Sequence, residues 1–190
     1  MERRGAIAVV GAGSWGTALS LVLAQAGWRV QLWARRAEIA EAIQRGRRNP
    51  QYLSECSLPN SVEATGDLAA ALAGARMVVL AVPSDGIREV ASRLAGCIRD
   101  DQAVISAAKG LEHETGRRLS EVVEECLGPS WQGRAVVLSG PNLAPEVAAG
   151  IATASVVACR DRELAAQAQA ALSTPRFRIY TNPDVVGVEL

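Results

Sequence analysis

The sequence is short of several things that whole classes of protein require. Its 20 basic side chains are balanced by 20 acidic ones, so no excess positive charge favours nucleic acid or an acidic membrane surface as a partner. No apolar run approaches the roughly 20 residues that a membrane-spanning helix needs. A single histidine, His113, excludes mechanisms that depend on two histidines. We therefore expect a protein whose partners include neither nucleic acid nor a membrane.

Cysteine is sparse and widely spaced. Cys56, Cys97, Cys126 and Cys159 form no C-x-x-C pair, which favours free thiols in a reducing cytoplasm over disulfides or a metal site. The first four residues, Met-Glu-Arg-Arg, carry charge, and glycines soon interrupt the apolar run that follows them. This pattern is typical of a strand and a loop and not of a signal peptide. The expected location is the cytoplasm.

What the chain does have is apolar content, 49% of its 190 residues, which suits a globular domain with a buried core. Short apolar runs predict strands at 6–10, 29–33, 76–82, 102–107, 134–138, 153–158 and 177–180. Apolar stripes at helical spacing lie between them, at 15–26, 87–94, 119–127 and 164–172. This alternation predicts an α/β fold with a doubly wound, mainly parallel sheet and helices on both faces.

Two segments depart from the alternation. Residues 46–60 are long and irregular for a connection between a strand and a helix, so they form either a functional loop or a small excursion. Residues 182–184, Asn-Pro-Asp, are typical of a turn and a helix start, and the apolar helix that begins after them stops at once. We interpret residues 1–181 as one domain and 182–190 as the truncated start of a second domain in a longer protein.

The most informative stretch is residues 7–16, Ile-Ala-Val-Val-Gly-Ala-Gly-Ser-Trp-Gly. On a strand that feeds a helix, its Gly-x-Gly-x-x-Gly spacing forms a cradle for the pyrophosphate of a dinucleotide. Gly11 permits the tight turn, Gly13 lets the backbone approach the phosphates, and Gly16 allows the helix to pack closely on the sheet. The positive end of the helix then faces the anion. These features predict a Rossmann-type domain that binds a nucleotide cofactor.

Polar residues also follow the other predicted strands. Arg35 and Arg36 follow the second strand, Ser84 the third, Lys109 the fourth, and residues 139–142 (Ser-Gly-Pro-Asn) the fifth. The carboxyl ends of parallel strands share one edge of the sheet, and ligands bind beyond that edge. The sequence therefore predicts a binding crevice to which all of these loops contribute.

The second loop bears on the choice of cofactor. Domains that select NAD usually carry an acidic residue about 20 residues beyond the glycine loop, where it binds the ribose hydroxyls. Arg35 and Arg36 occupy that place here, and guanidinium groups match a phosphate well. This favours NADP(H) over NAD(H). The alternative is that these arginines are only solvated charges that open the next helix.

Lys109 is the single lysine of the chain. A lone lysine at the carboxyl end of a strand indicates a site, because lysine can donate a proton or polarise a carbonyl, which arginine does not do readily. Lys109 is therefore the candidate catalytic residue. His113 lies four residues further on between two glutamates, and we interpret it as a solvated histidine in a turn.

With these residues in place, the sequence resembles the bacterial NAD(P)-dependent glycerol-3-phosphate dehydrogenases over essentially its whole length. The matching stretches are Gly-Ala-Gly-Ser-Trp-Gly-Thr-Ala-Leu at 11–19, Asn-Pro-Gln-Tyr-Leu at 49–53, Leu-Pro at 58–59, Ala-Val-Pro-Ser at 81–84, Ala-Lys-Gly-Leu-Glu at 108–112, Leu-Ser-Gly-Pro at 138–141 and the tail at 180–190. The glycine pattern alone is unspecific, whereas Lys-Gly-Leu-Glu together with Ser-Gly-Pro and the tail is specific.

The resemblance implies hydride transfer between NAD(P)H and dihydroxyacetone phosphate, giving sn-glycerol 3-phosphate for phospholipid synthesis. It implies cofactor contacts from six side chains or backbone positions outside the glycines, namely Ser14, Trp15, Arg35, Arg36, Lys109 and Ala144. It also implies that Lys109 touches the substrate and that Gly140 and Asn142 line the substrate side. The family usually has a hydroxyl residue where Asn142 stands, so this contact is altered.

The resemblance further implies that the family's chain continues past Leu190 with the general acid/base lysine and a helical substrate domain. We therefore expect this chain to bind the cofactor but to turn over substrate poorly, and the full-length protein is a candidate homodimer. Two alternatives remain open. One is another two-domain reductase of the 3-hydroxyacid or ketopantoate type, and the other is a non-catalytic sensor module that binds NADP as a ligand.

Overall fold

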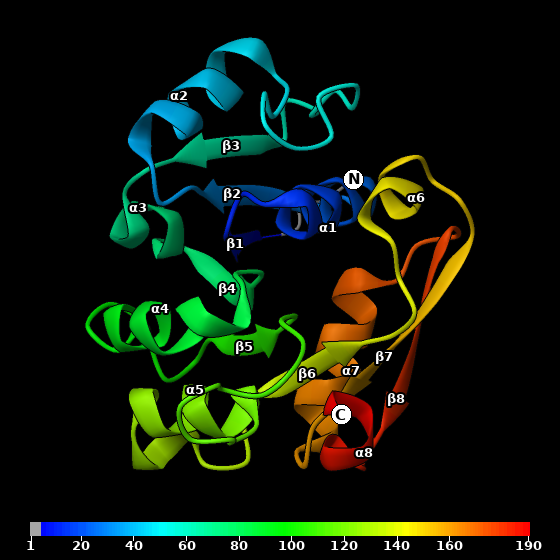
Figure 1. Ribbon diagram of the computed structural model, residues 1–190. Coiled ribbons are helices and arrows are strands. Elements are labelled where there is room, and N and C mark those ends of the chain that lie inside the picture. Colours follow the sequence, from blue (N-terminus) through cyan, green and yellow to red (C-terminus); the bar gives the residue numbers. More distant parts are fainter. Residues whose placement is uncertain (1–4) are drawn as a thin grey trace.

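An eight-stranded sheet organises residues 5–190, the part of the chain that the computed structural model describes (Figure 1). Its strands are β1 (Ala6–Val10), β2 (Arg29–Trp33), β3 (Val62–Thr65), β4 (Ala75–Leu80), β5 (Ala103–Ser106), β6 (Val136–Ser139), β7 (Thr153–Ala158) and β8 (Phe177–Asn182). Their order across the sheet is β3-β2-β1-β4-β5-β6-β7-β8. The charged N-terminus, residues 1–4, lies outside the described residues, and so does the prediction that it is not part of a signal peptide.

The strands pair in parallel except at one place, where β6 and β7 are antiparallel. The predicted doubly wound, mainly parallel sheet is thus confirmed. The seven predicted strands all exist, and their bounds differ from the observed ones by at most two residues. β3 was not predicted, because this four-residue edge strand, Val-Glu-Ala-Thr, contains no apolar run and buries only Val62.

Eight α-helices lie in the same described part of the chain. They are α1 (Ser14–Gln25), α2 (Ala37–Gly46), α3 (Leu68–Leu72), α4 (Ile87–Leu94), α5 (Leu119–Leu127), α6 (Ala144–Ala148), α7 (Arg162–Leu172) and α8 (Val185–Glu189). The four predicted apolar stripes correspond to α1, α4, α5 and α7. The helices α3 and α6 have five residues each, too few to show a periodic pattern in the sequence.

The core is divided by the sheet into two layers, because successive side chains of a strand point to opposite faces. Ile7 and Val9 of β1 belong to the layer that α1, α2, α6 and α7 cover. Ala8 and Val10 belong to the layer under α3, α4 and α5. All four of these β1 side chains are fully buried. Burial on both faces explains why β1 is a continuous apolar run that ends directly at the glycine loop.

The C-terminal segment begins as predicted, with a turn and a helix. The carboxylate of Asp184 caps α8 by accepting a hydrogen bond from the backbone N–H of Gly187 at 2.9 Å. At the other end of α8, the buried Glu189 carboxylate accepts hydrogen bonds from the backbone N–H of Ser120 at 2.7 Å and from its hydroxyl at 2.6 Å. Arg118 adds a third contact at 3.1 Å. The domain boundary after residue 181 stays a prediction.

None of the helices described in residues 5–190 combines the length and the apolar character that crossing a bilayer needs. Cys56, Cys97, Cys126 and Cys159 are free thiols. Burial raises the pKa of the Cys97 and Cys159 thiols above the ordinary value. These two cysteines are therefore poor nucleophiles, since the thiolate is the reactive form.

Candidate functional site

The glycine loop between β1 and α1 is held so tightly that two of its positions exclude any side chain. Gly11 has a φ of 118°, and its N–H donates to the carbonyl oxygen of Trp33 at 3.0 Å. A Cβ on Gly11 would lie 2.5 Å from the carbonyl oxygen of Ala81. A Cβ on Gly16 would lie 1.8 Å from the carbonyl oxygen of Gly11. The turn and the close helix packing expected of these two glycines are both present.

Gly13 is different, because the fold itself does not require a glycine there. It is the N-cap of α1 with a φ of −78°, and an added Cβ would meet no atom within 4 Å. Its side of the loop borders a cavity. No side chain caps α1 at this end, and the first-turn N–H groups of a helix have no partners within the helix. An anion placed beside Gly13 would satisfy them.

The cavity has a volume of about 370 Å³ and lies where the carboxyl ends of β1, β2 and β4 meet. Its walls are Gly11–Gly13, Trp33–Arg36, Ile39, Gln51, Tyr52, Ala81–Pro83, Asp85, Gly86, Glu89 and Val90. A volume of this size is within the range of small-molecule and cofactor sites. A crevice therefore exists at the predicted edge, but only three of the five expected loops line it, and those that carry Lys109 and residues 139–142 do not.

The two arginines that follow β2 both border this cavity, and their side chains are exposed. Arg36 donates to the side-chain carbonyl of Gln51 and lies 3.8 Å from the Glu38 carboxylate. Within residues 5–190, the Arg35 side chain makes no hydrogen bond or ion pair. Arg35 is thus free to pair with an anion in the cavity, whereas Arg36 is already oriented by a neighbour.

The irregular segment 46–60 forms the outer wall of the cavity through Gln51 and Tyr52. It is attached to the glycine loop by Asn49, whose side chain is fully buried. The Asn49 amide donates to the carbonyl oxygen of Ala12 at 2.8 Å and to the hydroxyl of Thr17 at 2.9 Å. Of the two sequence interpretations, a functional loop fits better than an excursion away from the site.

Lys109 and Gly140 meet at a second place along the same sheet edge, beyond β5 and β6. The Lys109 ammonium donates to the carbonyl oxygen of Gly140 at 2.7 Å, and the lysine is otherwise exposed. A Cβ on Gly140 would lie 2.8 Å from the Ser155 hydroxyl and 3.0 Å from the side-chain oxygen of Asn142. The resemblance placed these residues together on the substrate side, and the structure does bring them together.

Asn142 has its side chain turned to β7. Its amide NH₂ donates to the carbonyl oxygen of Ala154 at 2.9 Å, and its side-chain oxygen accepts from the hydroxyl of Ser155. Both polar atoms of the amide are therefore used within the protein. This contact orders the loop around Gly140, and a direct role of Asn142 toward substrate stays a prediction.

Several predicted site residues lie outside the cavity walls. Ser14, Trp15 and Gly16 form the first turn of α1, Ala144 begins α6, and these two helices pack against each other. The Trp15 ring packs edge-on against Phe177, with 6.4 Å between ring centroids. Trp15 is thus partly a packing residue. The cofactor contacts expected of Ser14, Trp15 and Ala144 stay predictions.

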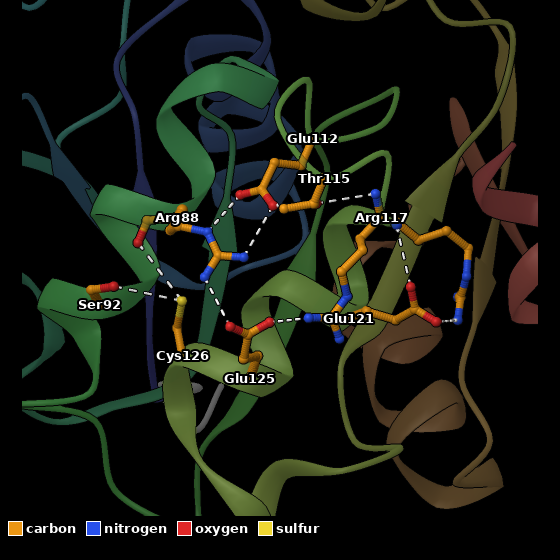
Figure 2. A network of polar contacts seen from close by, with 9 residues as sticks. Arg88, Ser92, Glu112, Thr115, Arg117, Glu121, Glu125 and Cys126 are labelled. Atoms are coloured by element: carbon orange, nitrogen blue, oxygen red, sulfur yellow. Dashed lines mark hydrogen bonds and ion pairs between the residues drawn. The ribbon is translucent and has the colours of Figure 1, made fainter.

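The loop that carries Lys109 is anchored by a polar network that Figure 2 shows. The Arg88 guanidinium of α4 donates to both oxygens of the buried Glu112 carboxylate, at 2.6 and 3.0 Å. Thr115 donates to the same carboxylate at 2.5 Å, and Arg88 also reaches Glu125 of α5 at 3.0 Å. Arg117 completes the network by pairing with Glu125.

These contacts favour the charged forms of both Glu112 and Arg88. The hydrogen bonds from Arg88 and Thr115 lower the pKa of Glu112 to about 2. The same pairing raises the pKa of the Arg88 guanidinium. Sequence reasoning missed this role of Glu112, because Arg88 lies 24 residues away in the chain. The neighbouring His113 is exposed in a turn, which confirms the prediction for that residue.

Comparison with known proteins agrees with this geometry. Residues 6–165 match the family model for the NAD-dependent glycerol-3-phosphate dehydrogenase N-terminus. The glycerol-3-phosphate dehydrogenase [NAD(P)+] of Corynebacterium jeikeium is 48% identical over 97% of this chain and 55% of its own length. That of Moorella thermoacetica is 50% identical over 96% of this chain and 53% of its own length. This chain thus spans about half the length of these curated relatives.

Solved structures of the same family also superpose closely on this chain. Glycerol-3-phosphate dehydrogenase from Coxiella burnetii superposes with a TM-score of 0.90 at 37% identity, over 98% of this chain and 56% of that one. A ketopantoate reductase from Ralstonia eutropha superposes less closely, with a TM-score of 0.67 at 21% identity, over 97% and 58%. The second likeness reflects the shared fold alone. The chain belongs to the NAD-dependent glycerol-3-phosphate dehydrogenase family and corresponds to the N-terminal part of its members.

Proposed function

We propose that this chain is the cofactor-binding part of an enzyme that transfers hydride reversibly between NAD(P)H and dihydroxyacetone phosphate. The observation that carries the proposal is the cavity at Gly13. Gly13, the N-cap residue of α1, lies in its wall with open space where a Cβ would stand, and Arg35 borders it without a partner among the described residues. These are the features that a dinucleotide pyrophosphate and an additional phosphate require.

The preferred cofactor in this proposal is NADP(H). Arg35 has no partner among the described residues, and Arg36 is held by the neutral side chain of Gln51 and only weakly by the exposed Glu38. Both guanidinium groups thus keep their positive charge at the cavity. A 2′-phosphate would pair with them, whereas the ribose hydroxyls of NAD(H) find no carboxylate directly after β2.

When bound, the nicotinamide ring supplies or accepts the hydride, and the residues of this chain hold the reactants. We assign to Lys109 the contact with the substrate. Its ammonium has three N–H donors, of which the carbonyl oxygen of Gly140 takes one. The others are available to a substrate carbonyl or phosphate oxygen. Arg88 positions this lysine by holding its loop at Glu112, three residues further along the chain.

The chain alone is proposed to bind cofactor and to turn over substrate poorly, because the relatives continue well beyond the part it matches. We place the full-length enzyme in the cytoplasm, which the four free thiols support, and treat a homodimer as its candidate assembly.

The test uses the full-length enzyme and follows NADPH oxidation with dihydroxyacetone phosphate, a 3-oxo acid and ketopantoate. We expect rapid oxidation with dihydroxyacetone phosphate alone. Lys109→Met, which keeps the chain length and removes the ammonium, should lower kcat/KM on the order of 100-fold or more. Equal rates with ketopantoate would favour the reductase alternative. A protein that binds NADPH yet oxidises it with none of the three would favour the sensor module.

A further inference from the structure

The outer wall of the cavity is connected by a chain of hydrogen bonds to Arg36, the N-cap residue of α2. The Asn49 side-chain oxygen accepts from the backbone N–H groups of Gln51 at 3.1 Å and of Tyr52 at 3.2 Å. The same amide donates to the carbonyl oxygen of Ala12 in the glycine loop. At the far end, the Gln51 side-chain oxygen accepts from the Arg36 guanidinium. Ala12, Gln51, Tyr52 and Arg36 all border the cavity.

An asparagine is the residue type that this position requires. Its amide donates and accepts at once, and here it makes four hydrogen bonds while fully buried. An aspartate of the same shape accepts but cannot donate, so the carbonyl oxygen of Ala12 would lose its donor and face a buried carboxylate. The segment 46–60 would then lose the contact that attaches it to the glycine loop.

Gln51 suits its own place for a different reason. Its side-chain oxygen orients the Arg36 guanidinium without neutralising it, whereas a carboxylate would cancel the charge that a phosphate needs. Glu38 lies 3.8 Å from Arg36, but both side chains are more than half exposed, so water screens that pair. Gln51 is thus the neighbour whose direct hydrogen bond orients Arg36 toward the cavity wall.

We propose that Asn49 and Gln51 are positioning residues that place Arg36 at the cofactor cavity, and that Gln51 thereby helps to set the preference for NADPH over NADH. Asn49 acts by fixing the 46–60 segment to the glycine loop, and Gln51 acts through Arg36. The inference rests on the proposed function, because it requires NADP(H) to occupy this cavity.

The experiment measures the Kd of NADPH and of NADH for the 190-residue chain by calorimetry, in a cycle of Gln51→Ala, Arg36→Ala and the double variant. Loss of one orienting hydrogen bond should raise the Kd of NADPH about three- to tenfold in Gln51→Ala and leave that of NADH within about twofold. Because Gln51 acts through Arg36, the double variant should bind NADPH no more weakly than Arg36→Ala alone. Additive losses, or a wild-type Kd in Gln51→Ala, would overturn the role of Gln51.

Asn49→Asp tests the attachment of the 46–60 segment to the glycine loop. Asn60→Asp is the matched control, since Asn60 is exposed in the same segment. Asn49→Asp should weaken NADPH and NADH together, about tenfold or more, and Asn60→Asp should weaken neither. Wild-type binding by Asn49→Asp would refute the role of Asn49, and if Asn49→Asp fails to fold, the Gln51 cycle still decides the proposal. A wild-type chain that binds neither nucleotide would instead reject the proposed function.

Discussion

Replacing Gly13 by alanine separates binding from folding, because a Cβ added to this glycine of the loop meets no protein atom within 4 Å, unlike one added to Gly11 or Gly16. Its φ of −78° is ordinary for alanine. Alanine is a poorer N-cap than glycine, and this costs up to about 1 kcal/mol. Alanine also makes the unfolded chain less flexible, which stabilises the folded state by about 0.4–1 kcal/mol. The two effects offset, so the free energy of unfolding should change by less than about 0.5 kcal/mol.

Cofactor affinity should fall much more. The new methyl group would stand between the α1 N-terminus and a phosphate, so that at least one charge-assisted hydrogen bond is lost. Each such bond contributes about 1.5–3 kcal/mol, which corresponds to a rise in Kd of roughly 10- to 150-fold. Urea unfolding gives the stability of the variant, and calorimetric titration with NADPH gives its affinity.

Two other glycines serve as controls for Gly13→Ala. Gly16→Ala should lower stability by about 1–3 kcal/mol or more, because its Cβ would stand 1.8 Å from the carbonyl oxygen of Gly11 and force the loop apart. Gly46 lies at the end of α2, where an added Cβ would meet open space. Gly46→Ala should therefore change the free energy of unfolding by less than about 1 kcal/mol and leave NADPH binding unchanged. A Gly13→Ala chain that binds NADPH as tightly as the wild type would refute the assignment of the phosphate cradle.

Four further predictions follow from the same geometry. Arg35→Ala should raise the Kd of NADPH at least about tenfold and that of NADH little, as measured by calorimetry, and equal losses would contradict a 2′-phosphate contact. The Glu112 carboxylate, with its pKa lowered to about 2, stabilises the fold fully above the ordinary carboxyl pKa and loses this effect as the pH falls toward 2. Glu112→Gln should therefore reduce the loss of unfolding free energy between pH 5 and about 2 in urea titrations, and an unchanged slope would contradict the pairing with Arg88. Gly140→Ala in the full-length enzyme should lower kcat/KM for dihydroxyacetone phosphate with a smaller change in NADPH affinity, because the Cβ would push against Ser155 and Asn142. The 190-residue chain alone should bind NADPH yet show no steady oxidation of it with dihydroxyacetone phosphate, and robust turnover would assign the main acid/base role to Lys109.

The parts of the fold that could be predicted from the sequence are those whose signal is local. β1 is apolar on both faces and ends at a glycine pattern, so its type, bounds and role follow from adjacent residues. β3 escaped prediction, because an edge strand needs little apolar surface and its hydrogen bonds to β2 leave no trace in its composition.

The site divides in the same way. Gly11, Gly16 and Arg35 were identified from spacing along the chain. Asn49 and Glu112 were noted only as parts of longer matching stretches, since their partners lie 37 and 24 residues away, and only the folded chain brings them together. A buried polar residue is recognised by what surrounds it, and a single sequence does not contain that information.

The most direct test of the central claim is a calorimetric titration of this chain with NADPH and, separately, with NADH. We predict saturable binding of one nucleotide per chain, with a Kd for NADPH at least about tenfold below that for NADH, because Arg35 and Arg36 border the cavity. Tighter binding of NADH would contradict the assigned role of the two arginines. Absence of binding by either nucleotide would contradict the assignment of the cavity itself.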